Sequence, residues 1–161
     1  MNPSSVKTRW VFLCPTSEQQ LIDSLMRTRY ASAMNNFALL LLRITVGLGL
    51  ASHGYNSVVN GGVEAIEGFA GFLESMGFPA PIAFAWIAKS TELAGGVCVA
   101  IGLFTRPAAL LCAVTMLVAI LTAHLGDSFD QWELALLYCA AMTVIAMSGP
   151  GKHSIDAKRN G

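Results

Sequence analysis

Two ionisable side chains, Lys89 and Glu92, lie three residues apart inside a long apolar stretch of this chain. If that stretch is a helix, a spacing of three places both side chains on the same face. A carboxylate far from the ends of an apolar helix is costly unless it is paired or protonated. Glu92 is therefore the first candidate for a proton carrier, and Lys89 is a candidate for its positively charged partner.

Other ionisable side chains occupy neighbouring apolar stretches. They are Arg43, His53, His124 and Glu133. A helix rises about 1.5 Å per residue, so Glu92 is expected near the middle of the membrane and Arg43 on its cytoplasmic side. The side chains expected in the outer half are His53, Lys89, His124 and Glu133. Imidazole donors and carboxylates suit a ligand that accepts hydrogen bonds and exchanges protons. The sequence predicts Glu92 and Glu133 as proton carriers, with His53, His124, Arg43 and Lys89 as ligand-binding groups.

Structural explanations of the same residues stay open at this point. His124 and Glu133 flank a short loop, where both would face water, and Lys89 has a stem long enough to reach the outer surface. Glu92 requires a partner, and a pair with either Arg43 or Lys89 would lock helix packing without any chemistry.

The elements that must position these residues are membrane helices. The chain has 161 residues, of which 54% are hydrophobic and 12% charged, whereas soluble domains carry about 25% charged residues. Four apolar stretches, about 37–59, 80–104, 107–125 and 131–148, approach the length that crosses a bilayer, which is about 20 residues. Each must be helical to satisfy its backbone in lipid. The predicted fold is all-α, a transmembrane four-helix bundle with a tight turn at Arg106-Pro107.

A short interfacial helix is predicted between the first two spans. Apolar residues recur at helical spacing from Val63 to Met76, with Glu64, Glu67 and Glu74 on the other side. Small residues on the first two spans (Gly47, Ala51, Gly54, Gly95 and Gly96) predict close helix packing.

Basic residues set the orientation. Lysine and arginine lie before the first span, at the second turn and after the last span, while the two opposite loops carry only acidic charges. The positive-inside rule places the basic side in the cytoplasm, so both termini are expected there. The predicted organisation is a basic tail over 1–35, mobile or interfacial, a membrane domain over 36–150 and a cytoplasmic tail over 151–161. Met34 is a second candidate start, which leaves open whether residues 1–33 belong to the mature chain.

The sequence lacks the motifs that usually bind several classes of cofactor. Cys14, Cys98, Cys112 and Cys139 form no C-x-x-C pair, which argues against an iron–sulfur, zinc or disulfide framework and favours thiols packed as small apolar groups. No dinucleotide fingerprint is present, and no flavin, metal or nucleic-acid site is predicted. His53 and His124 at similar depth leave a bis-histidine haem b as a minor alternative.

Several short motifs follow one another in a characteristic order: Leu41-Leu42-Arg43-Ile44 with Gly47, His53-Gly54, Glu92 to Gly96, Gly102 to Arg106, Ala123-His124, Glu133, and Gly149-Pro150-Gly151 with Ser154 and Asp156. In this order and spacing they resemble the DoxX family of small four-helix membrane proteins. The resemblance covers about 37–156 and departs at Ser57, where the family often has lysine.

The resemblance implies a subunit of a membrane redox system in the bacterial cytoplasmic (inner) membrane. Relatives include a subunit of a quinone-linked thiosulfate oxidoreductase and partners in complexes that handle thiol or oxidative stress. A bound quinone, protein partners and a homo-oligomer are therefore expectations, as is an oxidoreductase role if the chain is catalytic. The alternatives are a non-catalytic scaffold for soluble redox enzymes and a small-solute or proton-linked carrier that uses Glu92.

Overall fold

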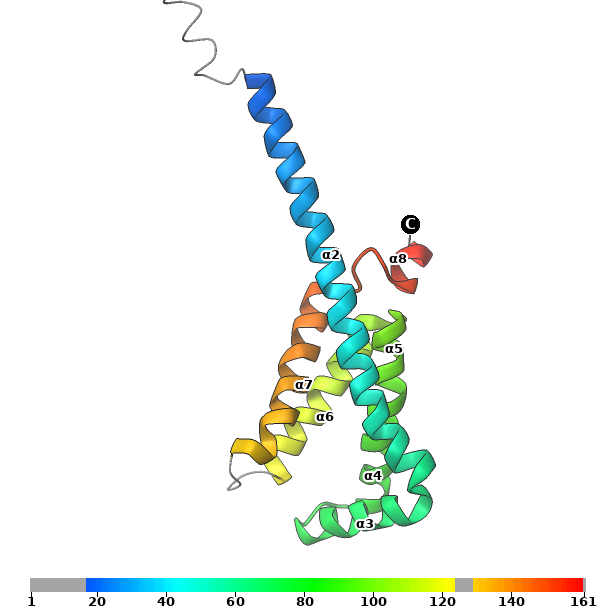
Figure 1. The fold of residues 1–161 in the computed structure, drawn as a ribbon. Coiled ribbons are helices and arrows are strands. Elements are labelled where there is room, and N and C mark those ends of the chain that lie inside the picture. The colour runs from blue at the N-terminus through cyan, green and yellow to red at the C-terminus, as the bar shows by residue number, and fades with distance from the viewer. Residues whose placement is uncertain (1–16, 124–128, 161) are drawn as a thin grey trace, which may run out of the picture. The chain divides into compact units, whose positions relative to one another are not determined.

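The computed structural model describes residues 17–123 and 129–160, and all the regular elements among them are helical (Figure 1). In chain order they are α2 (Ser17–Tyr55), η1 (Asn56–Asn60), α3 (Gly62–Ser75), α4 (Pro81–Ser90), η2 (Thr91–Gly95), α5 (Gly96–Ile101), α6 (Thr105–Ala123), α7 (Phe129–Ser148) and α8 (Ile155–Asn160). The elements η1 and η2 are single π-helical turns. The chain forms two units, Met1–Phe37 and Ala38–Gly161.

In the first unit, α2 is helical from Ser17 onward, and large apolar side chains such as Leu21, Leu25 and Tyr30 are exposed. The sequence predicted a mobile or interfacial tail over 1–35. Residues 17–35 of that range are helical, and residues 1–16 lie outside the described part of the chain.

The second unit confirms the predicted helical membrane bundle. Among the residues that the structure describes, three helical stretches are long and apolar enough to cross a membrane: Gln20–Asn60, which starts in the first unit, Pro81–Ile101 and Thr105–Thr122. A shorter apolar stretch, Trp132–Ser148, lies within α7. The whole of α7 has 20 residues, and at about 1.5 Å per residue this matches a hydrocarbon core about 30 Å thick.

Backbone contact between α2 and α5 explains the small residues on both helices. A β-carbon on Gly47 would lie 2.7 Å from the Ala100 nitrogen, and one on Gly96 would lie 2.6 Å from the Ala51 nitrogen. No side chain fits at such distances, so the predicted close packing of these glycines is confirmed.

The core lies mainly between α6 and α7, which run side by side (Figure 1). Its buried members include Ala109, Cys112 and Met116 from α6 with Met142 and Ile145 from α7. Cys98, Cys112 and Cys139, the cysteines within the described residues, are free thiols in or against this core. A smaller cluster joins α3 to α4 through Ile66, Ala70, Leu73 and Ala85.

The turn between the second and third spans differs from the prediction. The second span ends at Ile101, where Gly102 adopts a positive φ of 76° and its N–H donates to the Cys98 and Val99 carbonyl oxygens, as is typical of a helix C-terminus. The turn therefore lies at residues 102–104, and Arg106 and Pro107 belong to the first turn of α6. Proline is favourable there because its missing N–H would have had no helical acceptor.

The segment that follows α7 folds back onto this turn. Asp156 accepts hydrogen bonds from the Phe104 and Thr105 N–H groups, at 2.9 and 2.8 Å, and from the Thr105 hydroxyl at 2.8 Å. A carboxylate from a distant part of the chain thus caps the N-terminus of α6. Desolvation raises the pKa of Asp156, but the Thr105 and Phe104 hydrogen bonds and the nearby Arg43 charge outweigh it, so its pKa lies below the usual value.

Candidate ligand and proton site

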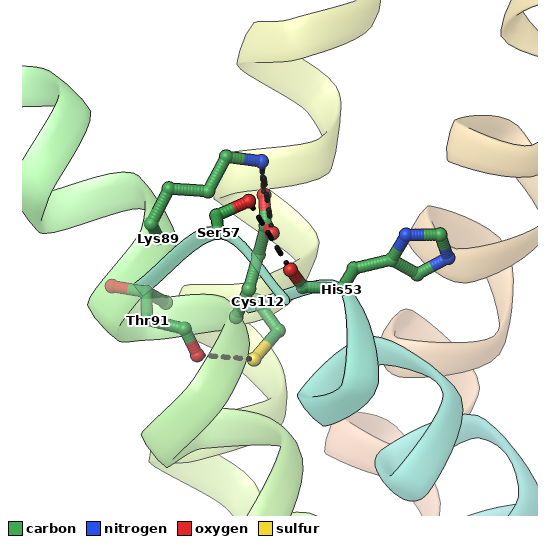
Figure 2. A network of polar contacts seen from close by, with 6 residues as sticks. His53, Ser57, Lys89, Thr91 and Cys112 are labelled. Carbon is green, nitrogen blue, oxygen red and sulfur yellow. Dashed lines mark hydrogen bonds and ion pairs between the residues drawn. The ribbon is translucent and has the colours of Figure 1, made fainter. Parts of the chain in front are cut away.

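The centre of the site is an ion pair between Lys89 and Glu92. Lys89 Nζ lies 2.9 Å from Glu92 Oε1 and 3.0 Å from Oε2, so the ammonium group bridges both carboxylate oxygens (Figure 2). The two side chains are 19% and 8% exposed. Of the two partners that the sequence left open for Glu92, the structure selects Lys89.

A π-helical turn carries Glu92. The turn η2 interrupts the second span from Thr91 to Gly95 and has α-helix on both sides. Such turns shift the register of the face that follows and leave carbonyl groups available for other donors. The Cys112 thiol on α6 donates to the Thr91 carbonyl oxygen at 3.6 Å, as Figure 2 shows. The periodicity of the sequence gave no sign of this turn.

An aromatic face completes the surroundings of Lys89. Its Nζ lies 4.8 Å from the centre of the Phe69 ring, which belongs to α3. A cation over an aromatic ring is stabilised by the negative face of the π system. The ammonium group is therefore held between Glu92 and Phe69.

A large apolar cavity opens beside the pair. Its volume is about 470 Å³, and it lies among α3, α4, η2 and α6. The lining consists of Phe69, Phe72, Leu73, Met76, Phe78, Phe84, Ile87, Ala88, Lys89, Glu92, Val114, Thr115, Val118, Ala119 and Thr122. Lys89 and Glu92 are its charged members. We refer to it below as the aromatic cavity.

A second, smaller cavity borders the same pair. Its volume is about 250 Å³, and its lining is Leu50, His53, Lys89, Glu92, Met116, Leu134, Ala135 and Tyr138. The His53 and Tyr138 rings meet edge to face, with centres 5.9 Å apart. In Figure 2 the His53 ring points away from Lys89, and the Ser57 hydroxyl donates to the His53 carbonyl oxygen at 3.2 Å. We call this the histidine cavity.

Arg43 lies in a different place from the one predicted. Its guanidinium group donates to the carbonyl oxygens of Val99, Ala100 and Pro150, and its side chain is 1% exposed. Val99 is seven residues beyond Glu92, about 10 Å along a helix. Arg43 is therefore a structural link between the end of α5 and the segment after α7, and the structure does not bring it to Glu92.

The remaining predicted residues are less informative. Glu133 is exposed on α7 and belongs to neither cavity lining. His124 lies outside the described residues, so the predicted pairing of His53 with His124 is not tested. Among residues 17–123 and 129–160, no group of three or more His, Cys, Asp and Glu side chains could hold a metal ion.

Several site residues were missed by the sequence analysis. Tyr138 and Phe69 lie beside the pair although they are remote from it in sequence. An aromatic residue on an apolar helix resembles an ordinary core residue. Only the packing of α3 and α7 in the structure brings Phe69 and Tyr138 to the site. The apolar spacing in Val63–Met76 predicted a helix with an apolar face, of which Ile66 and Leu73 are buried whereas Val63 and Phe72 are exposed. It gave no sign of the cavity.

These features define a helical membrane protein whose partly buried ion pair borders two cavities. The chain belongs to the DoxX family, whose family model matches residues 38–125. It is also 36% identical over 128 residues to the protein named "Putative oxidoreductase CatD" of Bacillus subtilis (strain 168), an alignment that covers 76% of this chain and 90% of that protein. No solved structure matches the chain significantly.

Proposed function

We propose that the aromatic cavity binds a quinone or quinol, and that the protein serves a membrane oxidoreductase complex as its quinone-binding subunit. The observation that carries the proposal is a charged donor–acceptor pair, Lys89 and Glu92, on the wall of an otherwise apolar, phenylalanine-lined cavity. Small-molecule sites have this character, with volumes of about 300–1,000 Å³ and a few polar groups that orient the ligand.

The residues match the two oxidation states of such a ligand. The Lys89 ammonium group can donate to a ring carbonyl, and the Glu92 carboxylate can accept from a ring hydroxyl. The Phe69, Phe72 and Phe84 side chains offer flat apolar surface to a ring and its tail. The ligand would supply two-electron redox chemistry, with electrons passed to or from a partner protein.

Family membership and the resemblance to a relative whose name includes oxidoreductase support a redox-associated role. The basic and acidic loop charges support insertion in the bacterial inner membrane with both termini in the cytoplasm. In that orientation Glu133, in the first turns of α7, lies near the outer surface, where it could accept protons that leave Glu92. Reporter fusions at each loop would test the orientation.

Ligand binding is tested by titrating a short-tailed ubiquinone or menaquinone analogue into purified protein in detergent. We expect saturable binding, and a loss of affinity of about 10- to 100-fold in Lys89→Met, because a hydrogen bond to a charged group contributes about 1.5–3 kcal/mol. Lys158→Met, an exposed lysine on α8, is the matched control and should bind normally. Absence of saturable binding by the wild-type protein would end the proposal.

A further inference from the structure

Glu92 borders both cavities, and the two cavities offer it different neighbours. Lys89 and Glu92 are the residues that the two linings share. The aromatic cavity is otherwise lined by phenylalanine, aliphatic and threonine side chains. The histidine cavity is otherwise lined by the polar rings of His53 and Tyr138 and by Leu50, Met116, Leu134 and Ala135. The carboxylate thus forms part of the wall between an apolar space and a more polar one.

We propose that Glu92 exchanges protons with water through the histidine cavity, while the ligand occupies the aromatic cavity. The ligand's identity rests on the proposed function, but the proton route does not. A volume of about 250 Å³ has room for several water molecules, since each occupies about 30 Å³ in the liquid. His53, Tyr138, Lys89 and Glu92 supply the polar partners that hold water in such a space.

Separate routes follow from what each cavity can conduct. A bound ring and tail would displace water from the aromatic cavity, whose lining has few groups that could relay a proton. A proton taken from a ligand hydroxyl would therefore have to leave by the other side. In this step the ligand O–H bond breaks, a Glu92 oxygen holds the proton and then gives it to water in the histidine cavity. No electron moves in either transfer.

The groups around Glu92 are suited to this task. Lys89 faces it from α4, His53 lies on α2, Tyr138 lies on α7, and the Cys112 thiol on α6 is engaged with the Thr91 carbonyl. His53 is an exposed residue of the histidine cavity lining. An imidazole can both donate and accept a hydrogen bond, so His53 can join a chain of water molecules in this cavity. His53 and Tyr138 are proton-transfer residues in this account and do not touch the ligand.

Two alanines allow each cavity to be blocked separately. Ala135 on α7 lines only the histidine cavity, and Ala119 on α6 lines only the aromatic cavity. Ala135→Leu and Ala119→Leu are therefore matched plugging variants. In ligand-free protein, the Glu92 carboxyl bands would be assigned by their loss in Glu92→Gln. Their response to a rapid pH jump would then be followed by infrared spectroscopy.

We expect Ala135→Leu to slow the response of the Glu92 bands by about 100-fold or more, the lower end of the effect of a positioned proton-transfer group. Tyr138→Phe, which keeps the ring and removes the hydroxyl, should slow it in the same direction. Ala119→Leu should leave the response unchanged but weaken binding of the quinone analogue. The inference is overturned if Ala119→Leu slows the response as much as Ala135→Leu, or if the Glu92 carboxyl bands do not change after the pH jump. Failure of wild-type protein to bind the analogue refutes the proposed function alone.

Discussion

The ion pair makes an asymmetric prediction about stability. Lys89→Met would leave the Glu92 carboxylate, which is 8% exposed, without its positive partner. Removing one member of a buried pair costs about 3–5 kcal/mol. Because Lys89 is itself 19% exposed, we expect the lower end of that range, a loss of about 3 kcal/mol.

The reverse substitution should be milder. Glu92→Gln leaves the Lys89 ammonium group over the Phe69 ring at 4.8 Å, a contact that contributes about 0.5–2 kcal/mol. The flexible lysine stem can also carry its charge toward water. We therefore expect a loss of about 1–2 kcal/mol in Glu92→Gln, and recovery of most of the Lys89→Met loss in the double variant, because no uncompensated charge remains.

The assay is a double-mutant cycle on the free energy of unfolding, measured by denaturant titration of the protein in mixed micelles. Lys158→Met serves as the control for removal of an exposed lysine and should be neutral. A double variant whose loss equals the sum of the single losses would show that the two side chains are energetically independent. A larger loss in Glu92→Gln than in Lys89→Met would refute the stabilising role given to Phe69.

Three further outcomes follow from the fold. Arg43→Met should lower the free energy of unfolding by about 3 kcal/mol, because charge-assisted hydrogen bonds to buried carbonyls are lost. It should leave the affinity for a quinone analogue unchanged. A change in that affinity would contradict the separation of Arg43 from Glu92. Asp156→Ala should cost about 1–2 kcal/mol at neutral pH as a lost helix cap. Since the pKa of Asp156 is lowered in the folded state, this contribution is complete above its ordinary pKa of 3.8 and disappears as the pH falls through the lower folded value, so unfolding titrations of wild type and variant should converge in acid. Gly47→Ala should cost about 1–3 kcal/mol by forcing α2 from α5, whereas thermal melts of Gly68→Ala, where an added β-carbon meets nothing within 4 Å, should show no loss.

The fold was largely predictable because membrane helices are governed by local rules. Length, apolar content and small residues at the contacts sufficed to predict the bundle and the close packing at Gly47 and Gly96. The Lys89–Glu92 pair was also accessible, since a spacing of three is a short-range property of any helix.

The parts that were missed depend on long-range packing. Arg43 and Glu92 are both polar residues in apolar spans, and depth alone suggested that they meet. The acceptors of Arg43 are backbone carbonyls, including that of Pro150. Because every residue has a backbone carbonyl, the amino-acid sequence does not indicate which of them bind Arg43. The C-terminal segment likewise looked like a tail, although its Asp156 caps α6. Tyr138 became a candidate only when α7 was seen beside the pair.

The central claim is that a quinone ring binds in the aromatic cavity against Lys89 and Glu92. Photolabelling with an azidoquinone, followed by peptide mapping, tests it most directly. The account predicts that the label lies on α3, α4 or the second half of α6, in residues such as Phe72, Phe84 and Val118, and that excess unlabelled quinone removes it. Displaceable label confined to α7 or to residues 17–37 would contradict it.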